Sequence, residues 1–260
     1  MISDKYVPSY KLIENNLSIR DDYNKFVRDI RKTRDKTTMI RYEISKKYLK
    51  GRGLEIGAFH APTPLADGCE ADYLDQMSID DIKKRFPKYE DYYCVYPNII
   101  ENGELLISIE DNKYDFLIAN HMIEHTENVF KTIQNHLRVL KKGGILYYAV
   151  PDKRFTFDKN RKLTTYEHLK AEYLYGSENY RYEHFLDFVT NVQNVKEEKE
   201  ASKVAKKLSE EGLDTHFHVW TSETFIDHIK KAIDDKILNI EILEHTHKND
   251  IESITILKKL

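Results

Sequence analysis

The stretch that decides the fold is Gly53-Leu54-Glu55-Ile56-Gly57, a short apolar segment that runs directly into a glycine. Residues 21–50, which precede it, are rich in charge and contain no glycine, whereas Pro62 and Pro64 follow it closely. An apolar segment that is bounded by turn-forming residues is typical of a core β-strand. We therefore predict that this stretch is the first strand of a sheet and that it ends in a tight turn.

Strands and helices are predicted to alternate after this point. Strand patterns occupy residues 71–75, 114–120, 145–150, 237–243 and 251–257, and helical spacing of apolar residues occupies 79–86, 129–140 and 221–232. The stretch 145–150 is almost continuously apolar, which is typical of a strand that is covered on both faces. This alternation predicts an α/β fold with a doubly wound, Rossmann-like sheet of mostly parallel strands, and beyond the six patterns that the sequence shows we expect seven strands in all.

Two helical additions to this fold are expected. Residues 1–50 are predicted to form an N-terminal helical extension, because apolar residues recur near helical spacing from residue 21 onward. Residues 51–260 then form the α/β domain. Within it, residues 152–213 interrupt the alternation and are rich in Tyr, His, Arg and Lys. We expect this segment to be a helical insertion over the edge of the sheet where a substrate enters.

The composition argues against several classes of protein. The chain has 41 Lys and Arg residues against 44 Asp and Glu residues, a formal net charge of −3, so no global basic field attracts nucleic acid or anionic lipid. Cys69 and Cys94 have neither zinc-ribbon nor redox-pair spacing. No stretch approaches about 18 apolar residues, and residues 1–10 lack the apolar segment of a signal peptide. We expect a cytoplasmic protein with no nucleic-acid partner and no membrane span, and the sequence leaves a homodimer open.

The turn after the first predicted strand lies where open parallel sheets bind nucleotides, beyond the carboxyl ends of the strands. A dinucleotide fingerprint requires glycines where Phe59 and Ala61 stand, because backbone must approach the pyrophosphate closely. Asp75 comes at the end of the second predicted strand, where a carboxylate accepts hydrogen bonds from ribose hydroxyls. The pattern therefore favours an adenosine ligand without a pyrophosphate.

Four stretches, in their order along the chain, resemble the class I S-adenosylmethionine-dependent methyltransferases. They are residues 54–62, 71–75, 101–125 and 140–152. The chain is most similar to the small-molecule branch associated with surface-sugar (capsule and lipopolysaccharide) biosynthesis. Of the three glycines in the loop of that family, only the first, Gly57, is present. The resemblance implies an enzyme of this class with S-adenosyl-L-methionine as its cofactor and a small-molecule substrate, a sugar or nucleotide sugar.

The resemblance also implies where the cofactor binds. The implied positions are Glu55, Ile56, Gly57, Ala58, Asp75, Asn120 and His121. Glu55 and Gly57 belong near the methionine part, Asp75 on the ribose, and Asn120 with His121 beside the sulfonium, while residues 98–106 line the adenine. The alternative for Glu55 and Asp75 is a pair of solvated acids at strand ends.

Histidines supply the candidates for catalysis. Methyl transfer is an in-line displacement at an electrophilic carbon, so the enzyme mainly aligns the nucleophile and removes its proton. Histidine suits the removal of a hydroxyl proton because its ordinary pKa, about 6.5, lies close to working pH. We predict His121 as the catalytic base, since it directly follows the strand that presents the methyl donor. His184 and His218 are the next candidates.

A metal site is the alternative use of the same region. His121, Glu124 and His125 stand at positions i, i+3 and i+4, which puts them on one face of a helix that begins there. The spacing resembles the Glu-x-x-Glu-His site of metal-dependent methyltransferases that act on quinone precursors and small-RNA ends, although His121 replaces the first acid. His216 or His218 could supply a fourth ligand. The competing interpretation, which the sequence favours, has no metal: Glu124 and His125 bond to nearby backbone and fix the loop.

The predicted insertion carries the candidates for binding the substrate. They are Asp152, Arg154, Arg161, His168 and Tyr182. Arginine can bind phosphate with two parallel hydrogen bonds, and tyrosine can stack on a base or sugar, so the mixture suits a nucleotide-linked or phosphorylated sugar. A solvated helical face that carries aromatic residues would show the same composition.

Three functional hypotheses follow. The leading one is an S-adenosylmethionine-dependent O-methyltransferase that transfers a methyl group to a hydroxyl of a nucleotide-linked sugar in surface polysaccharide biosynthesis. The second keeps the donor but uses a metal and acts on a small phenol or a nucleic-acid end, although the net negative charge weakens the nucleic-acid version. The third is a non-catalytic S-adenosylmethionine-binding protein, because a fold does not guarantee an activity.

Overall fold

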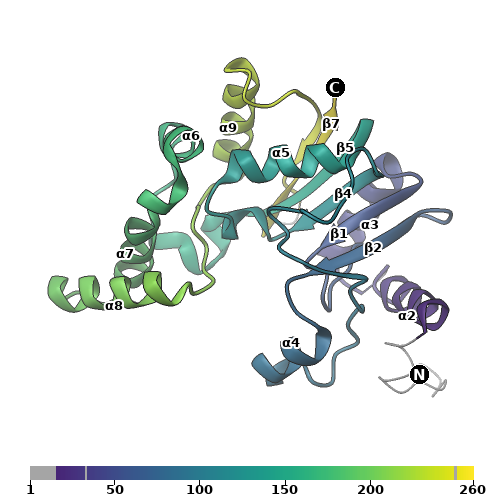
Figure 1. The fold of residues 1–260 in the computed structure, drawn as a ribbon, viewed down its shortest axis with the longest axis horizontal. Helices are drawn as coiled ribbons and strands as arrows, with labels where there is room; N and C mark the ends of the chain where they lie inside the picture. Colours follow the sequence, from purple (N-terminus) through teal and green to yellow (C-terminus); the bar gives the residue numbers. More distant parts are fainter. Residues whose placement is uncertain (1–15, 33, 249–250) are drawn as a thin grey trace. The chain divides into compact units, whose positions relative to one another are not determined.

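The computed structural model describes residues 16–32, 34–248 and 251–260. The chain divides into two compact units, Met1–Gly103 and Glu104–Leu260, and Figure 1 labels most of their helices and strands. Residues 1–15 of the predicted helical extension lie outside the described residues. The border between the units does not coincide with the predicted boundary at residue 50, because helix α2 (Leu17–Asp29) packs on the first strands: its Val27 shares a buried cluster with Tyr73 and Val95.

The first unit contains three parallel strands. β1 (Arg52–Ile56), β2 (Glu70–Asp75) and β3 (Ile99–Ile100) lie in the order β3-β2-β1. Helices α2 and α3 (Lys36–Tyr48) precede β1, and α4 (Ile79–Arg85) with the short η1 (Pro87–Tyr89) follows β2. The register pairs Ile56 with Leu74, so the carboxyl ends of β1 and β2 meet at the same edge.

The second unit contains four strands in the order β4-β5-β7-β6. They are β4 (Tyr114–Asn120), β5 (Leu140–Pro151), β6 (Ile240–Thr246) and β7 (Glu252–Lys259). β4 and β5 are parallel, whereas β7 runs antiparallel to both of its neighbours. Helix α5 (Val129–Val139) connects β4 to β5, and α9 (Ser222–Asp234) precedes β6.

Residues between β5 and α9 form the helical insertion. It contains α6 (Tyr166–Tyr175), α7 (Arg181–Asn191) and α8 (Glu198–Glu211), together with the short helices η3 (Lys153–Phe155), η4 (Phe157–Asn160) and η5 (Ser177–Asn179). Helices α7 and α8 lie side by side (Figure 1) and share a small buried core. That core contains Phe185, Val189, Ala201, Ala205 and Phe217. The insertion thus has a small hydrophobic core of its own.

The predicted fold class is confirmed: the structure is α/β and Rossmann-like, with seven mostly parallel strands, helices before β1 and a helical insertion. Two details differ. The two-residue strand β3 escaped prediction because it is too short to show a pattern. The helix predicted over residues 129–140 ends at Val139, and β5 begins one residue later and five residues before the predicted strand 145–150. None of the helices among the described residues is long and apolar enough to cross a membrane.

Candidate active site

The turn after β1 in the first unit is built around a buried carboxylate. Glu55 is almost completely buried, and its Oε1 accepts a hydrogen bond of 2.8 Å from the Thr63 amide. Burial raises the pKa of Glu55 to about 7, although the hydrogen bonds from Thr63 oppose this rise. Glu55 is therefore not a solvated acid at a strand end. It holds the loop from residue 57 to residue 63 against the end of β1.

Gly57 forms the turn itself. Its φ of +66° lies in the left-handed region that favours glycine, and its amide donates to the Leu74 carbonyl over 2.9 Å. Apart from its two neighbours in the chain, no described residue has an atom within 4 Å of the position that a Cβ would take, so the backbone is open at this point. Phe59 also has a positive φ, +43°, and its ring packs against Tyr89. The loop thus keeps a glycine-like backbone at Phe59 while placing a bulky side chain where a dinucleotide fingerprint has none.

Asp75 is the last residue of β2, and only one of its two carboxylate oxygens accepts hydrogen bonds from the described residues. Its Oδ1 accepts hydrogen bonds from the amides of Gln76 (2.7 Å) and Met77 (3.4 Å), which fix the orientation of the carboxylate. Oδ2 accepts none from the described residues. Burial raises the pKa of Asp75 above its ordinary value. An oriented carboxylate with a free oxygen fits the role predicted for Asp75, the binding of a ribose hydroxyl.

In the second unit, His121 directly follows β4. Its φ of +50° is unusual for a residue other than glycine, and its amide donates to the Ala149 carbonyl over 2.8 Å. The ring Nε2 lies 2.6 Å from Oε2 of Glu252, a buried residue at the start of β7. The side chain of His121 is 36% exposed, so the imidazole is both oriented by a carboxylate and open to a ligand. Such a pair is the usual arrangement of a catalytic base.

Asn120, the other residue predicted beside the sulfonium, is the last residue of β4.

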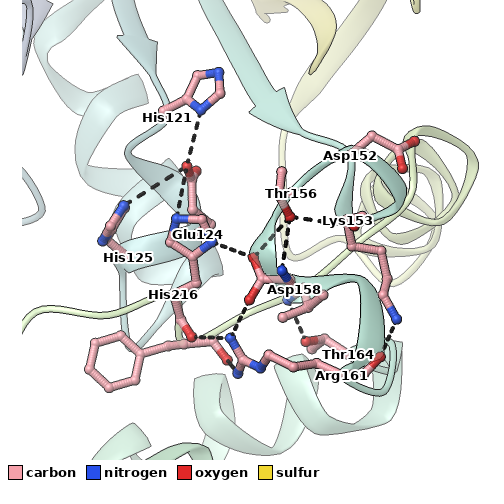
Figure 2. A network of polar contacts seen from close by, with 12 residues as sticks. His121, Glu124, His125, Asp152, Lys153, Thr156, Asp158, Arg161, Thr164 and His216 are labelled. Atoms are coloured by element: carbon pink, nitrogen blue, oxygen red, sulfur yellow. Dashed lines mark hydrogen bonds and ion pairs between the residues drawn. The ribbon is translucent and has the colours of Figure 1, made fainter. Parts of the chain in front are cut away.

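Glu124 lies at the centre of a group of histidines (Figure 2). It belongs to the short helix η2 (Ile123–His125) and is completely buried, yet neither of its carboxylate oxygens makes a hydrogen bond with the described residues. Its Oε1 lies 3.8 Å from Nδ1 of His121 and 4.0 Å from Nε2 of both His125 and His216. Three imidazole nitrogens thus face one carboxylate at distances longer than a hydrogen bond.

The three histidines are each held from behind by a further carboxylate. His125 contacts Asp214 with Nδ1 at 2.8 Å, and His216 contacts Asp158 with Nδ1 at 2.6 Å, while Glu252 holds His121. Burial lowers the pKa of His125, but its hydrogen bond to Asp214 and the nearby carboxylates outweigh burial and raise it. Metal-ligating histidines typically have this arrangement, in which the outer nitrogen donates to a carboxylate and the inner one faces the metal. Residues 121–125 therefore do more than fix a loop. We call His121, Glu124, His125 and His216 the Glu124 centre.

His184 and His218, the other candidates for the base, belong to a second cluster. Both are buried, and their Nε2 atoms lie 2.7 Å and 2.8 Å from the carboxylate oxygens of Glu172 on α6. His168, predicted to bind substrate, contacts Glu172 as well, at 3.0 Å. The structure therefore groups these three histidines with each other and places His121 in the Glu124 centre.

Three of the predicted substrate-binding residues have partners within the second unit. Asp152 is buried, accepts from the amide of Ser222 at the start of α9 and pairs with Arg154 at 2.6 Å. Arg161 is buried between Asp158 (2.9 Å) and Asp187 (2.6 Å) and also donates to the carbonyl of His216. These contacts give both arginines a structural role, and substrate binding by any of the three stays a prediction.

The insertion also contains a cleft of about 470 Å³ next to the second cluster. Arg161, His168 and His184 line it together with polar residues of α7, including Asp187 and Asn191. Tyr182 does not line the cleft; its hydroxyl lies 2.8 Å from Ser202 Oγ.

Several residues of these sites were missed by sequence reasoning. Glu252 lies 131 residues from His121, and Asp158 and Asp214 lie in segments without a recognisable motif. Glu172 had a weak signal, since it stands four residues after His168 on a predicted helical insertion. His216 was weighed only as a fourth metal ligand, and the structure places it beside Glu124.

Comparison with known proteins assigns the chain to a family. Residues 50–232, more than half of the chain, match the methyltransferase-domain family. A protein of Methanocaldococcus jannaschii described as uncharacterized is 30% identical over 139 residues, which are 50% of this chain and 62% of that protein. The chain thus spans less than two thirds of the length of this curated relative.

Solved structures of methyltransferases are similar at low identity. A SAM-dependent methyltransferase from Aquifex aeolicus has 10% identity and a TM-score of 0.46, over 91% of this chain and 98% of that chain. One from Methanosarcina mazei has 19% identity and a TM-score of 0.46, over 84% and 98%. The family match carries the assignment: this chain belongs to the methyltransferase-domain family and holds an S-adenosylmethionine-dependent methyltransferase domain.

Proposed function

We propose that the protein is an O-methyltransferase that transfers the methyl group of S-adenosylmethionine to a hydroxyl of a sugar, in nucleotide-linked form, during the assembly of a surface polysaccharide. The observation that carries the chemistry is the pair of His121 and Glu252 at the end of β4, with Nε2 and Oε2 2.6 Å apart. The choice of a sugar rests on the family resemblance of the sequence and on the cleft in the insertion, whose lining includes Arg161, His168 and Asp187.

The pair accounts for proton removal. Bound S-adenosylmethionine supplies an electrophilic methyl carbon. When the sugar oxygen forms its bond to that carbon, the carbon–sulfur bond breaks and the sulfur keeps the electron pair. The hydroxyl proton passes to His121, and the buried carboxylate of Glu252 stabilises the imidazolium that forms. Within the first unit, Gly57 has a left-handed backbone and Oδ2 of Asp75 accepts no hydrogen bond from the described residues, which supports the proposal that a ribose hydroxyl of the donor binds Asp75.

A specific observation favours a second candidate, a metal-dependent methyltransferase that acts on a small phenol or a nucleic-acid end. A buried carboxylate without a hydrogen bond is costly unless a cation or donor compensates it. Glu124 is such a carboxylate, and it faces three histidines that outer carboxylates orient. Glu124, His125 and His216, with His121, would hold a divalent cation, which would act as a Lewis acid on the acceptor oxygen.

Binding of the donor is tested first. We expect S-adenosylhomocysteine to bind at micromolar concentration in a calorimetric titration, and Asp75→Ala to weaken this binding by about tenfold, because a charged hydrogen bond contributes about 1.5–3 kcal/mol when fully formed. Absence of binding in the wild type would exclude both enzyme candidates. Unchanged binding in Asp75→Ala would disprove only the ribose contact.

The acceptor is tested by transfer of label from methyl-labelled donor to a panel of nucleotide sugars, phenols and RNA ends. Transfer to a nucleotide sugar that survives exhaustive chelation supports the leading proposal. Transfer to a phenol or an RNA end that chelation abolishes supports the metal-dependent candidate instead. Donor binding without transfer to any of them leaves a non-catalytic binding protein. The cytoplasmic location and a homodimer stay predictions.

A further inference from the structure

The second cluster, in the helical insertion, has a different geometry from the Glu124 centre. His168 and Glu172 stand one turn apart on α6, His184 comes from α7, and His218 comes from the segment before α9. The Nε2 atoms of His184, His168 and His218 lie 2.7, 3.0 and 2.8 Å from the oxygens of Glu172. The Nε2 atoms of His168 and His184 lie 3.2 Å from each other. Three separate segments thus deliver four donor groups to one point.

These separations are close to those of a tetrahedral metal site. Zinc binds histidine nitrogen and carboxylate oxygen at about 2.0–2.2 Å, and tetrahedral geometry then separates neighbouring donor atoms by about 3.3–3.5 Å. The separations of 2.7–3.2 Å in the cluster are up to about 0.8 Å shorter than that spacing, and the four ligand atoms all lie within 4.8 Å of one another, so small shifts of the rings would admit an ion. Without a metal, His168 and His184 share one oxygen of Glu172 as their acceptor while their Nε2 atoms lie 3.2 Å apart.

The surroundings fit a closed site with one route of entry. The side chains of Glu172, His184 and His218 are at least nine-tenths buried, whereas that of His168 is 25% exposed. His168 and His184 also line the cleft of about 470 Å³, so an ion can reach the cluster through it. The ring of His218 stacks on Trp220, which fixes its orientation.

From these observations we infer a structural zinc-type site in the insertion, with His168, Glu172, His184 and His218 as the four ligands of a divalent transition metal. Imidazole nitrogen suits zinc among the common divalent metals, and four protein ligands leave no open position for substrate. The metal joins α6 and α7 to the segment that contains His218. That segment also delivers His216 to the Glu124 centre, so the site stabilises one wall of the active site without touching the reacting atoms.

The experiment titrates zinc into the full-length protein after removal of metal by chelation. It compares the wild type with His168→Gln, chosen because His168 is the most exposed ligand and its loss least threatens folding. His247→Gln is the matched control, since His247 is 20% exposed and lies outside both clusters. We expect His168→Gln to lose one equivalent of tight zinc, with affinity at that site reduced by more than about 100-fold, because even loss of an outer-shell partner costs about 10–100-fold.

A further variant separates this site from the Glu124 centre. His125→Gln should keep the zinc equivalent that His168→Gln loses, and cobalt substituted at the retained site should show the visible absorption of a tetrahedral complex. The inference is overturned if the wild type binds no zinc at micromolar concentration, or if His168→Gln binds as much zinc as tightly as the wild type. Should His168→Gln fail to fold, the melting temperature decides: zinc must raise it in the wild type and in His125→Gln.

Discussion

The two histidine–glutamate clusters of the second unit have the same composition and opposite geometry. Around Glu124, three imidazole nitrogens stand 3.8–4.0 Å away, and each ring is held from behind by Glu252, Asp214 or Asp158. Around Glu172, three imidazole nitrogens lie within 2.7–3.0 Å. In the first cluster, the imidazole nitrogens lie beyond hydrogen-bond distance of Glu124, and outer carboxylates hold the rings in place. In the second cluster, the nitrogens lie at hydrogen-bond distance of Glu172.

The difference separates a working site from a structural one. In the Glu124 centre, the outer carboxylates fix each ring so that the inner nitrogens stay available to a proton, a hydroxyl or a cation. In the Glu172 cluster, the inner nitrogens lie at contact distance from the carboxylate, and with or without a metal the cluster joins three segments of the insertion.

The largest expected effect is on turnover. His121→Ala removes the base, so we expect the turnover number to fall by about 10²–10⁴-fold, the usual contribution of general-base catalysis. Methyl transfer from labelled donor measures it, with His247→Gln as the control. Near-normal turnover in His121→Ala would show that the base lies elsewhere and that the Glu124 centre is not where the proton is removed.

The second prediction concerns stability without metal. In the presence of chelator, Glu172→Gln should lower the free energy of unfolding by about 2–4 kcal/mol, because it breaks charged hydrogen bonds with buried histidines. The matching change, Glu124→Gln, should cost nearly nothing or stabilise, because it removes a buried carboxylate that makes no hydrogen bond with the described residues. Urea unfolding of both variants measures the two changes. Equal losses would remove the distinction between the clusters.

The fold could be predicted from the sequence, but only part of the two clusters could, because their contacts join residues that are far apart along the chain. Strand and helix patterns are local, and so is the spacing that brings Glu124 and His125 together after β4. The partner of His121 is not local, since Glu252 approaches only when β7 enters the sheet. Nor does a sequence say whether an arginine already has partners in its own chain: Arg161, predicted to bind phosphate, is buried between two aspartates. Similarly, the sequence names His184 and His218 as candidate bases, which stay predictions, but it does not show that Glu172 lies between them.

A smaller effect is expected in the dependence of stability on pH. Burial alone would raise the pKa of Glu172, but the charge of His218 and hydrogen bonds from His168 and His184 hold it well below its usual range. Its contribution is therefore present above about pH 4.5 and is lost as the pH falls below that value. Burial lowers the pKa of His168, but the hydrogen bond to Glu172 outweighs burial and raises it, so the contribution of His168 is lost as the pH rises above about 6.5.

The wild type in chelator should consequently show a stability maximum between these limits, and Glu172→Gln should flatten it. Urea unfolding midpoints between pH 4 and pH 8 measure the profile. If the two proteins showed parallel profiles, Glu172 would not be the group that makes stability depend on pH in this cluster.

The smallest effect is expected at Tyr182, which stands on α7 two residues before His184. Its ring is partly exposed and its hydroxyl contacts Ser202 on α8 at 2.8 Å, so Tyr182→Phe should change the free energy of unfolding by no more than about 0.5 kcal/mol. Zinc binding should be unchanged, because the ligand on α7 is His184 and not this tyrosine. The Michaelis constant for the acceptor then decides what Tyr182 does. An increase without loss of stability or zinc would mean that substrate binding extends along α7 beyond the residues that line the cleft, and an unchanged value would leave Tyr182 as a link between α7 and α8.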